Sequence, residues 1–212
     1  MYNRNVEYSA LILRSRPSGE SNSEVTLLTA EEGLLRATVF GGPKSKLRSH
    51  AAPYNSGRVW IYRDPAKEYA KISDFDVQSW RPGLRELYER TMAASGIAET
   101  ILSSHGGGGE WETALKLAVS ALDAMEQASE ELCERLLVHF LWQWTGFLGI
   151  QPSLEDIPLN PGSRRWLAAA AELEPSQIYR YSMDKKSFDE TKSYITAIMT
   201  EAIGRKLSSW DW

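Results

Sequence analysis

The first 82 residues contain short runs of β-favouring residues, and one of them, Leu34–Phe40, alternates apolar and polar side chains as expected of a strand that buries one face. Turn-forming glycine, proline, serine and asparagine residues separate these runs. The five runs are Tyr8–Leu13, Glu24–Thr29, Leu34–Phe40, Arg58–Tyr62 and Glu68–Phe75. Five short strands without helical periodicity predict a closed or partly closed β-barrel. A length of about 80 residues suits an OB-fold, but strand count alone leaves an SH3-like barrel open.

After Trp80 the apolar residues recur every three or four positions, which predicts amphipathic helices. The expected helices are Leu84–Ser104, Trp111–Ala128, Glu130–Phe147, a short stretch Ser163–Leu173, and a final helix from Ser187 to Ile203 that starts with a Ser187/Glu190 capping box. The third is apolar on most of its circumference, so we place it at the centre of a bundle. We therefore predict an α+β protein, with an N-terminal OB-fold β-barrel over residues 1–82 and an all-α helical domain over residues 83–212.

One basic stretch, Glu31–Ser49, stands out within the predicted barrel. A turn at Gly33 leads into the third strand, which ends at Gly41-Gly42-Pro43, and a loop follows. This loop carries three cations and no acidic residue, namely Lys44, Lys46 and Arg48. Cations on a glycine-bearing backbone favour contact with a polyanion. A solvated connector without a ligand is the alternative that charge pattern alone leaves open.

The charge distribution supports the polyanion interpretation. The whole chain has a net charge of −4, but residues 1–82 carry 12 Lys and Arg against 9 Asp and Glu, whereas residues 83–212 carry 12 against 19. The positive balance therefore lies in the half that holds the basic stretch, and a local field can attract phosphates even when the molecule is acidic. Further cations that could extend the path of a bound polyanion, if they face the same side, are Arg14, Arg16, Arg36 and Arg58.

Aromatic side chains in the fourth strand form a second candidate feature. Alternation along this strand puts Val59 and Ile61 on one face and Trp60 and Tyr62 on the other. Outward aromatics beside a basic groove are typical stacking platforms for single-stranded nucleic acid. Packing of Trp60 and Tyr62 against the helical domain is the alternative.

Several function classes find no support in the chain. A single cysteine, Cys133, excludes an intramolecular disulfide and a cysteine-rich zinc site. No apolar run approaches the roughly 18 residues of a membrane span, and the N-terminus lacks a signal-peptide layout, so we expect a cytoplasmic protein that does not contact membranes. Because no nucleophile elbow, phosphate-binding glycine loop or paired carboxylates are present, we expect no enzyme and no cofactor. His139, on the central helix, is interpreted as structural.

Short motifs in the chain resemble those of the RecO recombination and repair family. They run from the first strand to the end of the central helix, over about Ala10 to Leu154. The matching residues are Ala10–Leu13, Gly19-Glu20, Leu27–Thr29, Glu32-Gly33, Gly41–Lys46, Tyr88, Ala93-Ala94 and Phe147–Pro152. The segments Gly41–Lys46 and Phe147–Pro152 are the most specific of these.

The resemblance implies an OB-fold followed by a helical domain, in a bacterial cytoplasmic protein that associates with the nucleoid when bound to DNA. It implies binding of single- and double-stranded DNA, annealing of complementary strands, and loading of RecA together with RecR. The helical domain is further implied to contact the acidic, hydrophobic C-terminal tail of single-stranded DNA-binding protein. One departure is large: many members carry a four-cysteine zinc module, whereas the corresponding segment Ser153–Ser187 has no cysteine, so no metal is carried over.

Two hypotheses follow. The first is a non-catalytic mediator that neutralises DNA phosphates while leaving base edges free to pair. The second is a protein-interaction adaptor in the same pathway, whose DNA binding is weak or depends on its partner. The acidic balance of residues 83–212 favours the second hypothesis for the helical half.

Overall fold

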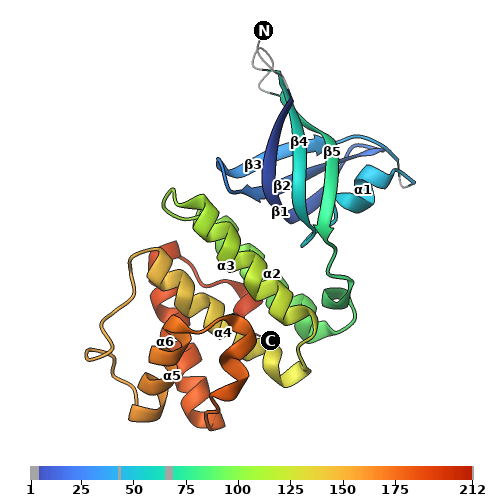
Figure 1. Cartoon of the computed structure of the whole chain (residues 1–212). Helices are drawn as coiled ribbons and strands as arrows, with labels where there is room; N and C mark the ends of the chain where they lie inside the picture. The colour runs from blue at the N-terminus through green and yellow to red at the C-terminus, as the bar shows by residue number, and fades with distance from the viewer. Residues whose placement is uncertain (1–4, 43, 65–68, 212) are drawn as a thin grey trace. The chain divides into compact units, whose positions relative to one another are not determined.

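The computed structural model describes residues 5–42, 44–64 and 69–211, so that Pro43 and Glu68, both named above, lie outside the described residues. The chain begins with strands and continues with helices (Figure 1). No helix in these described ranges is long and apolar enough to cross a membrane.

The N-terminal part is a five-stranded closed barrel with strand order β1-β2-β3-β5-β4. Its strands are β1 (Asn5–Ser18), β2 (Asn22–Thr29), β3 (Gly33–Val39), β4 (Ser56–Asp64) and β5 (Tyr69–Ser79), with a short helix α1 (Lys46–His50) between β3 and β4. This topology is that of an OB-fold, which confirms the predicted fold class and removes the SH3-like alternative. The β2–β3 turn is also as predicted, because Gly33 has φ 71°.

Alternation along the strands fills the barrel. Alternate side chains on each strand point inward and are almost fully buried, and on β5 a register shift opposite Trp60 and Ile61 lets both Ile72 and Phe75 face the interior. The interior residues are Tyr8, Ala10, Ile12, Val25, Leu27, Ala37, Val39, Val59, Ile61, Ile72 and Phe75. The barrel is therefore a packed core, and its ligand-binding capacity lies on its outer face, its ends and its seams.

The C-terminal part is helical. Its elements are η1 (Pro82–Arg85), α2 (Tyr88–Ser103), α3 (Trp111–Glu126), α4 (Glu130–Phe147), α5 (Pro161–Glu172), η2 (Pro175–Arg180), α6 (Lys185–Ile203) and η3 (Ser208–Trp210). Helix α4 contacts α2, α5, η2 and α6, and it buries Trp142 and Trp144. Its predicted central position is thus confirmed.

The start of the first long helix and the N-cap of the last helix differ from the predictions. The first long helix begins at Tyr88 instead of Leu84, because residues 82–85 form a 3-10 turn. The last helix begins at Lys185, since the Asp184 carboxylate accepts a hydrogen bond from the Ser187 backbone N–H at 3.0 Å and so acts as the N-cap. The expected Ser187/Glu190 capping box is therefore not the start of this helix.

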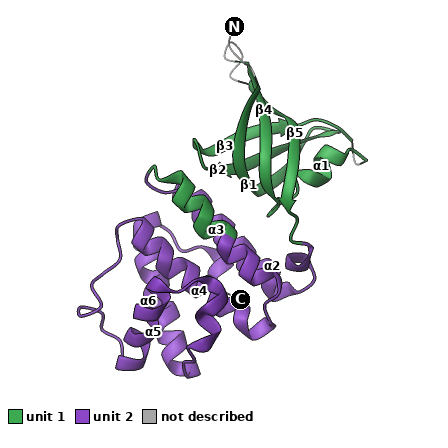
Figure 2. Ribbon diagram, viewed as in Figure 1, with its two compact units in different colours: residues 1–81, 109–119 green, residues 82–108, 120–212 purple. Residues whose placement is uncertain are grey.

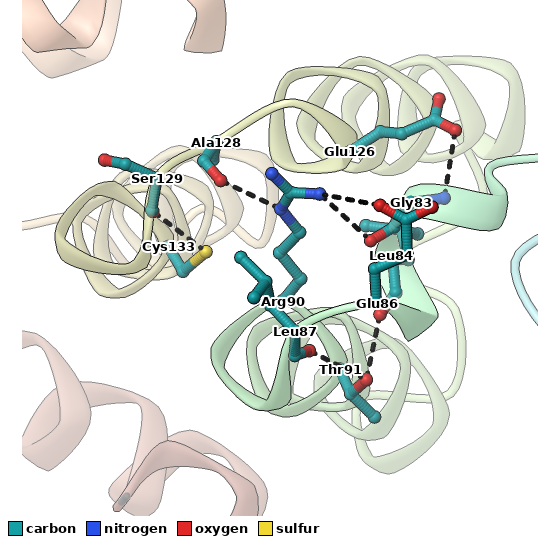
Figure 3. A network of polar contacts seen from close by, with 10 residues as sticks. All are labelled: Gly83, Leu84, Glu86, Leu87, Arg90, Thr91, Glu126, Ala128, Ser129 and Cys133. Atoms are coloured by element: carbon teal, nitrogen blue, oxygen red, sulfur yellow. Dashed lines mark hydrogen bonds and ion pairs between the residues drawn. The ribbon is translucent and has the colours of Figure 1, made fainter.

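A network around Arg90 holds the 3-10 turn in place (Figure 3). Its Nε donates to the Ala128 carbonyl oxygen at 2.8 Å and its Nη1 to the Gly83 carbonyl oxygen at 3.2 Å. Thr91 Oγ1 donates to the Leu84 carbonyl oxygen at 2.8 Å. Arg90 and Thr91 thus donate to the Gly83 and Leu84 carbonyls of the 3-10 turn, which stabilises that turn ahead of α2.

By its internal contacts the chain divides into two compact units (Figure 2). The first comprises residues 1–81 and 109–119, and the second comprises residues 82–108 and 120–212. The first unit therefore consists of the barrel together with the first half of α3, and the second contains the remaining helices.

His139 gives the second unit a pH-sensitive stability. Its Nε2 donates to the Leu173 carbonyl oxygen at 3.0 Å, and burial lowers its pKa from 6.5 to about 4, against the opposing effects of that hydrogen bond and of Glu174. The unfolded chain binds a proton near pH 6.5 and the folded chain does not, so stability falls as pH drops from about 6.5 towards 4.

We expect this histidine to account for a loss of roughly 3 kcal/mol in unfolding free energy by pH 4. Denaturant unfolding at several pH values, compared with His139→Gln, measures the effect, since glutamine can donate to Leu173 but does not titrate. Direct NMR titration of the imidazole is the second readout. An imidazole that titrates near its ordinary pKa would contradict the prediction.

Candidate nucleic-acid interface

A β-bulge in β1 decides where Arg14 and Arg16 point. Ile12 pairs with Leu27 and Arg14 with Thr26, so the register shifts at Leu13. Ile12 and Leu27 both lie in the barrel interior. Strict alternation from Ile12 would have placed Arg14 inside as well, whereas the bulge restores it to the outer face.

The outer face of β1, β2 and β3 then gathers arginines across one sheet. Arg14 lies opposite Thr26, and Thr26 lies opposite Arg36 on the next strand. Arg16 lies opposite Glu24 in the adjacent row, and Glu24 is the acidic residue on this face of β2. Directly opposed residues project to the same side of a sheet, so these three predicted arginines are brought together.

The predicted loop after β3 is partly a helix. Lys44 lies in a turn and is exposed, whereas Lys46 and Arg48 lie on α1. The prediction of a flexible loop over these cations is therefore wrong beyond Ser45, the residue that precedes the helix. Tertiary contacts fix this short segment, since five residues alone cannot sustain a helix.

Asn55 and His50 anchor α1 to the barrel. Asn55 Nδ2 donates to the carbonyl oxygens of Ser49 and His50 at 3.2 and 2.9 Å, satisfying the C-terminal end of the helix. His50 Nδ1 donates to the Phe75 carbonyl oxygen at 2.8 Å, which ties α1 to β5. Lys46 and Arg48 are consequently held in position relative to the barrel.

Arg16 and the cations after β3 share one end of the barrel. Val39, the last residue of β3, pairs with Ser23, the second residue of β2 after the β1–β2 turn. Arg16 lies close to the same turn. We call Arg16, Arg36, Lys44, Lys46 and Arg48 the cation group. Among the described residues, no ion pair involves any of these five. Uncompensated charges of one sign on one sector create a local positive field.

Arg58, Trp60 and Tyr62 occupy a different sector. They lie on β4, which pairs with the first half of β1. Their partners on β1 are Ser9, Glu7 and Asn5, respectively. Arg58 lies 3.8 Å from Glu7 and 3.1 Å from Asp76. These carboxylates offset its charge, so the structure does not join Arg58 to the cation group.

The aromatic side chains on β4 are half-buried. Trp60 faces Glu7 on one neighbouring strand and Asp74 on the other. The Lys71 ammonium lies 5.2 Å from the centre of the Tyr62 ring. Stacking of these rings on bases stays a prediction, and for Trp60 it would take place beside two acidic residues.

Sequence reasoning missed a pocket of about 420 Å³ in the barrel unit. Its walls come from three strands and a turn, and its lining residues are Glu32, Leu35, Arg36, Ile61, Arg63, Asp64, Tyr69 and Ala70. No local pattern announces it, because β3, β4 and β5 contribute side chains that are far apart in the chain.

The residues of this chain do not supply the four cysteine ligands of the zinc module that many RecO proteins carry. Cys133 is buried on α4, its Sγ lies 3.3 Å from the Ser129 carbonyl oxygen, and burial raises the pKa of its thiol to about 11. Within the ranges that the structure describes, no group of three or more His, Cys, Asp or Glu residues is arranged to hold a metal ion. The cysteine-free segment contains α5, with Trp166 buried, and η2.

Comparison with known proteins agrees with this architecture. Residues 1–80 match the family model described as Recombination protein O N terminal. The chain is 29% identical over 153 residues to the DNA repair protein RecO of Synechococcus sp. (strain JA-3-3Ab), covering 68% of this chain and 51% of the relative. It is 28% identical over 148 residues to the DNA repair protein RecO of Pelotomaculum thermopropionicum, covering 69% and 56%. The chain thus spans about half the length of the curated relatives it matches.

Proposed function

We propose that this chain, which belongs to the RecO family of DNA repair proteins, is a non-catalytic repair and recombination mediator that binds single- and double-stranded DNA. In this proposal it anneals complementary strands and, with RecR, assists loading of RecA on strands coated by single-stranded DNA-binding protein. Its proposed DNA contact is the cation group at one end and one face of the barrel.

The observation that carries the proposal is that the cations of the barrel differ in whether carboxylates lie within ion-pair distance of them. The cation group has no ion-pair partners among the described residues, while Arg58 is flanked by Glu7 and Asp76. DNA phosphates bind to cations that have no ion-pair partner, because neutralising the phosphates releases counterions from the DNA. Contacts limited to phosphates leave base edges exposed, as annealing requires.

Salt-dependent titration of single- and double-stranded oligonucleotides tests the proposal. For single strands, a log–log slope of about −2 corresponds to contacts by Lys44, Lys46 and Arg48 alone, and about −3.5 to the whole cation group. Duplex DNA should give steeper slopes of about −2.7 and −4.5. Affinity that does not change with salt would contradict phosphate contact by these residues.

The second candidate function is the protein-interaction adaptor, and one observation in the helical unit favours it. Tyr179 and Tyr181 are 58% and 45% exposed, and the Arg180 guanidinium lies 5.7 Å from the centre of the Tyr179 ring. Exposed tyrosine and arginine side chains are enriched at the energetic centres of interfaces. An acidic, apolar peptide such as the proposed tail of single-stranded DNA-binding protein complements them.

Capture experiments separate the two candidates. RecR and the isolated tail peptide are each tested with the chain in the absence of DNA, and DNA titrations are run with and without RecR. DNA binding that appears only with RecR present favours the adaptor. Binding of DNA by the chain alone favours the mediator.

A further inference from the structure

We propose that the pocket between β3 and β5 accepts a single nucleobase from a bound DNA strand. This inference rests on the proposed DNA binding and adds to it a site for an unpaired base. The site differs from the Trp60 and Tyr62 face of β4, because its walls are built from other side chains.

The pocket lies beside the parallel seam of the barrel. Among the described residues, β3 and β5 pair at Thr38 and Lys71. Leu35 and Arg36 precede this pair on β3, and Tyr69 and Ala70 precede it on β5, and all four line the pocket. The pocket therefore lies between β3 and β5, on the N-terminal side of the Thr38–Lys71 pair. A base from a bound strand can enter between the two strands there.

The size and surface of the pocket suit a planar ring. Its volume of about 420 Å³ falls within the range of small-molecule sites. Leu35, Ile61 and Ala70 supply apolar walls, and Tyr69 supplies an aromatic ring. The Phe40 ring, 45% exposed, lies 6.2 Å from the Tyr69 ring between centroids, so an aromatic pair stands beside the pocket. Aromatic rings of this kind stack on bases of any sequence.

The charges of the lining favour a neutral ligand with hydrogen-bonding edges over a phosphate. The formal charges of the lining sum to zero, with Arg36 and Arg63 against Glu32 and Asp64, although Arg36 forms no ion pair among the described residues. A phosphate would meet no net positive charge there. A base presents both donors and acceptors, and guanidinium and carboxylate groups complement these edges.

Hydrogen bonds hold one wall in a defined geometry. Glu32 accepts from the buried Tyr8 hydroxyl at 2.7 Å through Oε1 and from Arg63 Nη2 at 2.7 Å through Oε2. Arg63 also lies over the Tyr8 ring, 5.4 Å from its centre. Burial, followed by the bond to Glu32, raises the pKa of Tyr8 to about 12, so the hydroxyl remains a donor at neutral pH. The carboxylate and guanidinium are thus oriented before a ligand arrives.

Arg36 connects the pocket with the proposed phosphate contacts. It lines the pocket and also belongs to the outer face that carries Arg14. A strand whose phosphates follow the cation group therefore passes the mouth of the pocket. One base can enter while neighbouring bases stay outside and free to pair.

The test compares two single strands of about 12 nucleotides, a length within the site sizes of single OB-folds. One is oligothymidine, and the other has the same backbone with every base removed. Wild-type protein is expected to bind oligothymidine about five- to 150-fold more tightly than the abasic strand, the range for one stacked base. Ala70→Leu, which fills the pocket, should reduce oligothymidine binding to the abasic level and leave abasic binding unchanged.

Two further variants locate the base. Tyr69→Ala should reduce the preference for oligothymidine, whereas Trp60→Ala should preserve it, and thermal melts establish that each variant is folded. Loss of the preference in Trp60→Ala but not in Ala70→Leu or Tyr69→Ala would overturn the pocket assignment. Equal, salt-dependent binding of both strands by wild-type protein overturns the pocket and leaves the proposed DNA contact standing. No binding of either strand overturns both.

Discussion

Reversing the charges of Lys44 and Lys46 together, as Lys44→Glu with Lys46→Glu, is expected to weaken single-stranded DNA binding by about 100-fold or more at about 0.1 M salt. Both side chains are exposed at the end of the barrel that also carries Arg16. The change removes two phosphate contacts and adds two repulsive charges. The salt slope should become shallower by about 1.4, since each lost contact on a single strand removes about 0.7. Fluorescence anisotropy over a salt series measures both quantities.

A matched control comes from the helical unit. Lys185→Glu with Lys186→Glu changes the net charge by the same amount, and these side chains are 88% and 87% exposed at the start of α6. Acidic residues are favourable in a first helical turn, so this control variant should fold. Its DNA affinity should stay within about threefold of wild type, because Lys185 and Lys186 do not belong to the cation group and already pair with Asp189 and Glu190. Equal losses in both variants would show that net charge, and not the cation group, governs binding.

Gly57→Ala is expected to destabilise the barrel by about 3 kcal/mol or more. A β-carbon at this position would overlap the Asp76 carbonyl oxygen and would lie 2.8 Å from the Gln78 backbone nitrogen. Both clashing atoms belong to the backbone of β5, so no rotamer change relieves the contact. Gly57 also sits at a register shift between β4 and β5, where displacement of one strand would disturb the closed barrel.

Denaturant unfolding followed through amide resonances of β1 to β5 isolates the barrel from the helical unit. Gly42→Ala is the control, because a β-carbon there meets no atom within 4 Å. The control should change stability by less than about 0.5 kcal/mol. A Gly57→Ala barrel as stable as the control would mean that the two strands lie farther apart than the structure shows.

Local periodicity is a sound guide to the elements of this protein because burial acts on each element separately. Runs of β-favouring residues predicted all five strands, since each strand buries side chains in the barrel interior. The continuous apolar surface of residues 130–147 predicted a central helix, and α4 is surrounded by other helices. Helix starts were less predictable. The Asp184 side chain sets the start of α6, and the hydrogen bonds of Arg90 precede the start of α2. Each start depends on which neighbouring polar group bonds the free backbone groups.

The candidate site was predictable in part. The charge of residues 1–82 and the run Lys44, Lys46 and Arg48 are visible in the sequence and point to the end of the barrel where we propose the DNA contact. Nothing in the sequence distinguishes Arg58 from Arg16, however. The register places Glu7 and Asp76 within ion-pair distance of Arg58, whereas Arg16, although opposite Glu24, forms no ion pair among the described residues.

The sequence by itself determined the class of the protein, a barrel followed by helices, because hydrophobic period is a local property. The tertiary structure decided which side chains share a surface. A bulge at Leu13 turns Arg14 outward, Asn55 and His50 fix the helix that carries Lys46 and Arg48, and three strands enclose the pocket. These arrangements depend on strand register and long-range hydrogen bonds, and a one-residue shift in register would send each side chain to the opposite face.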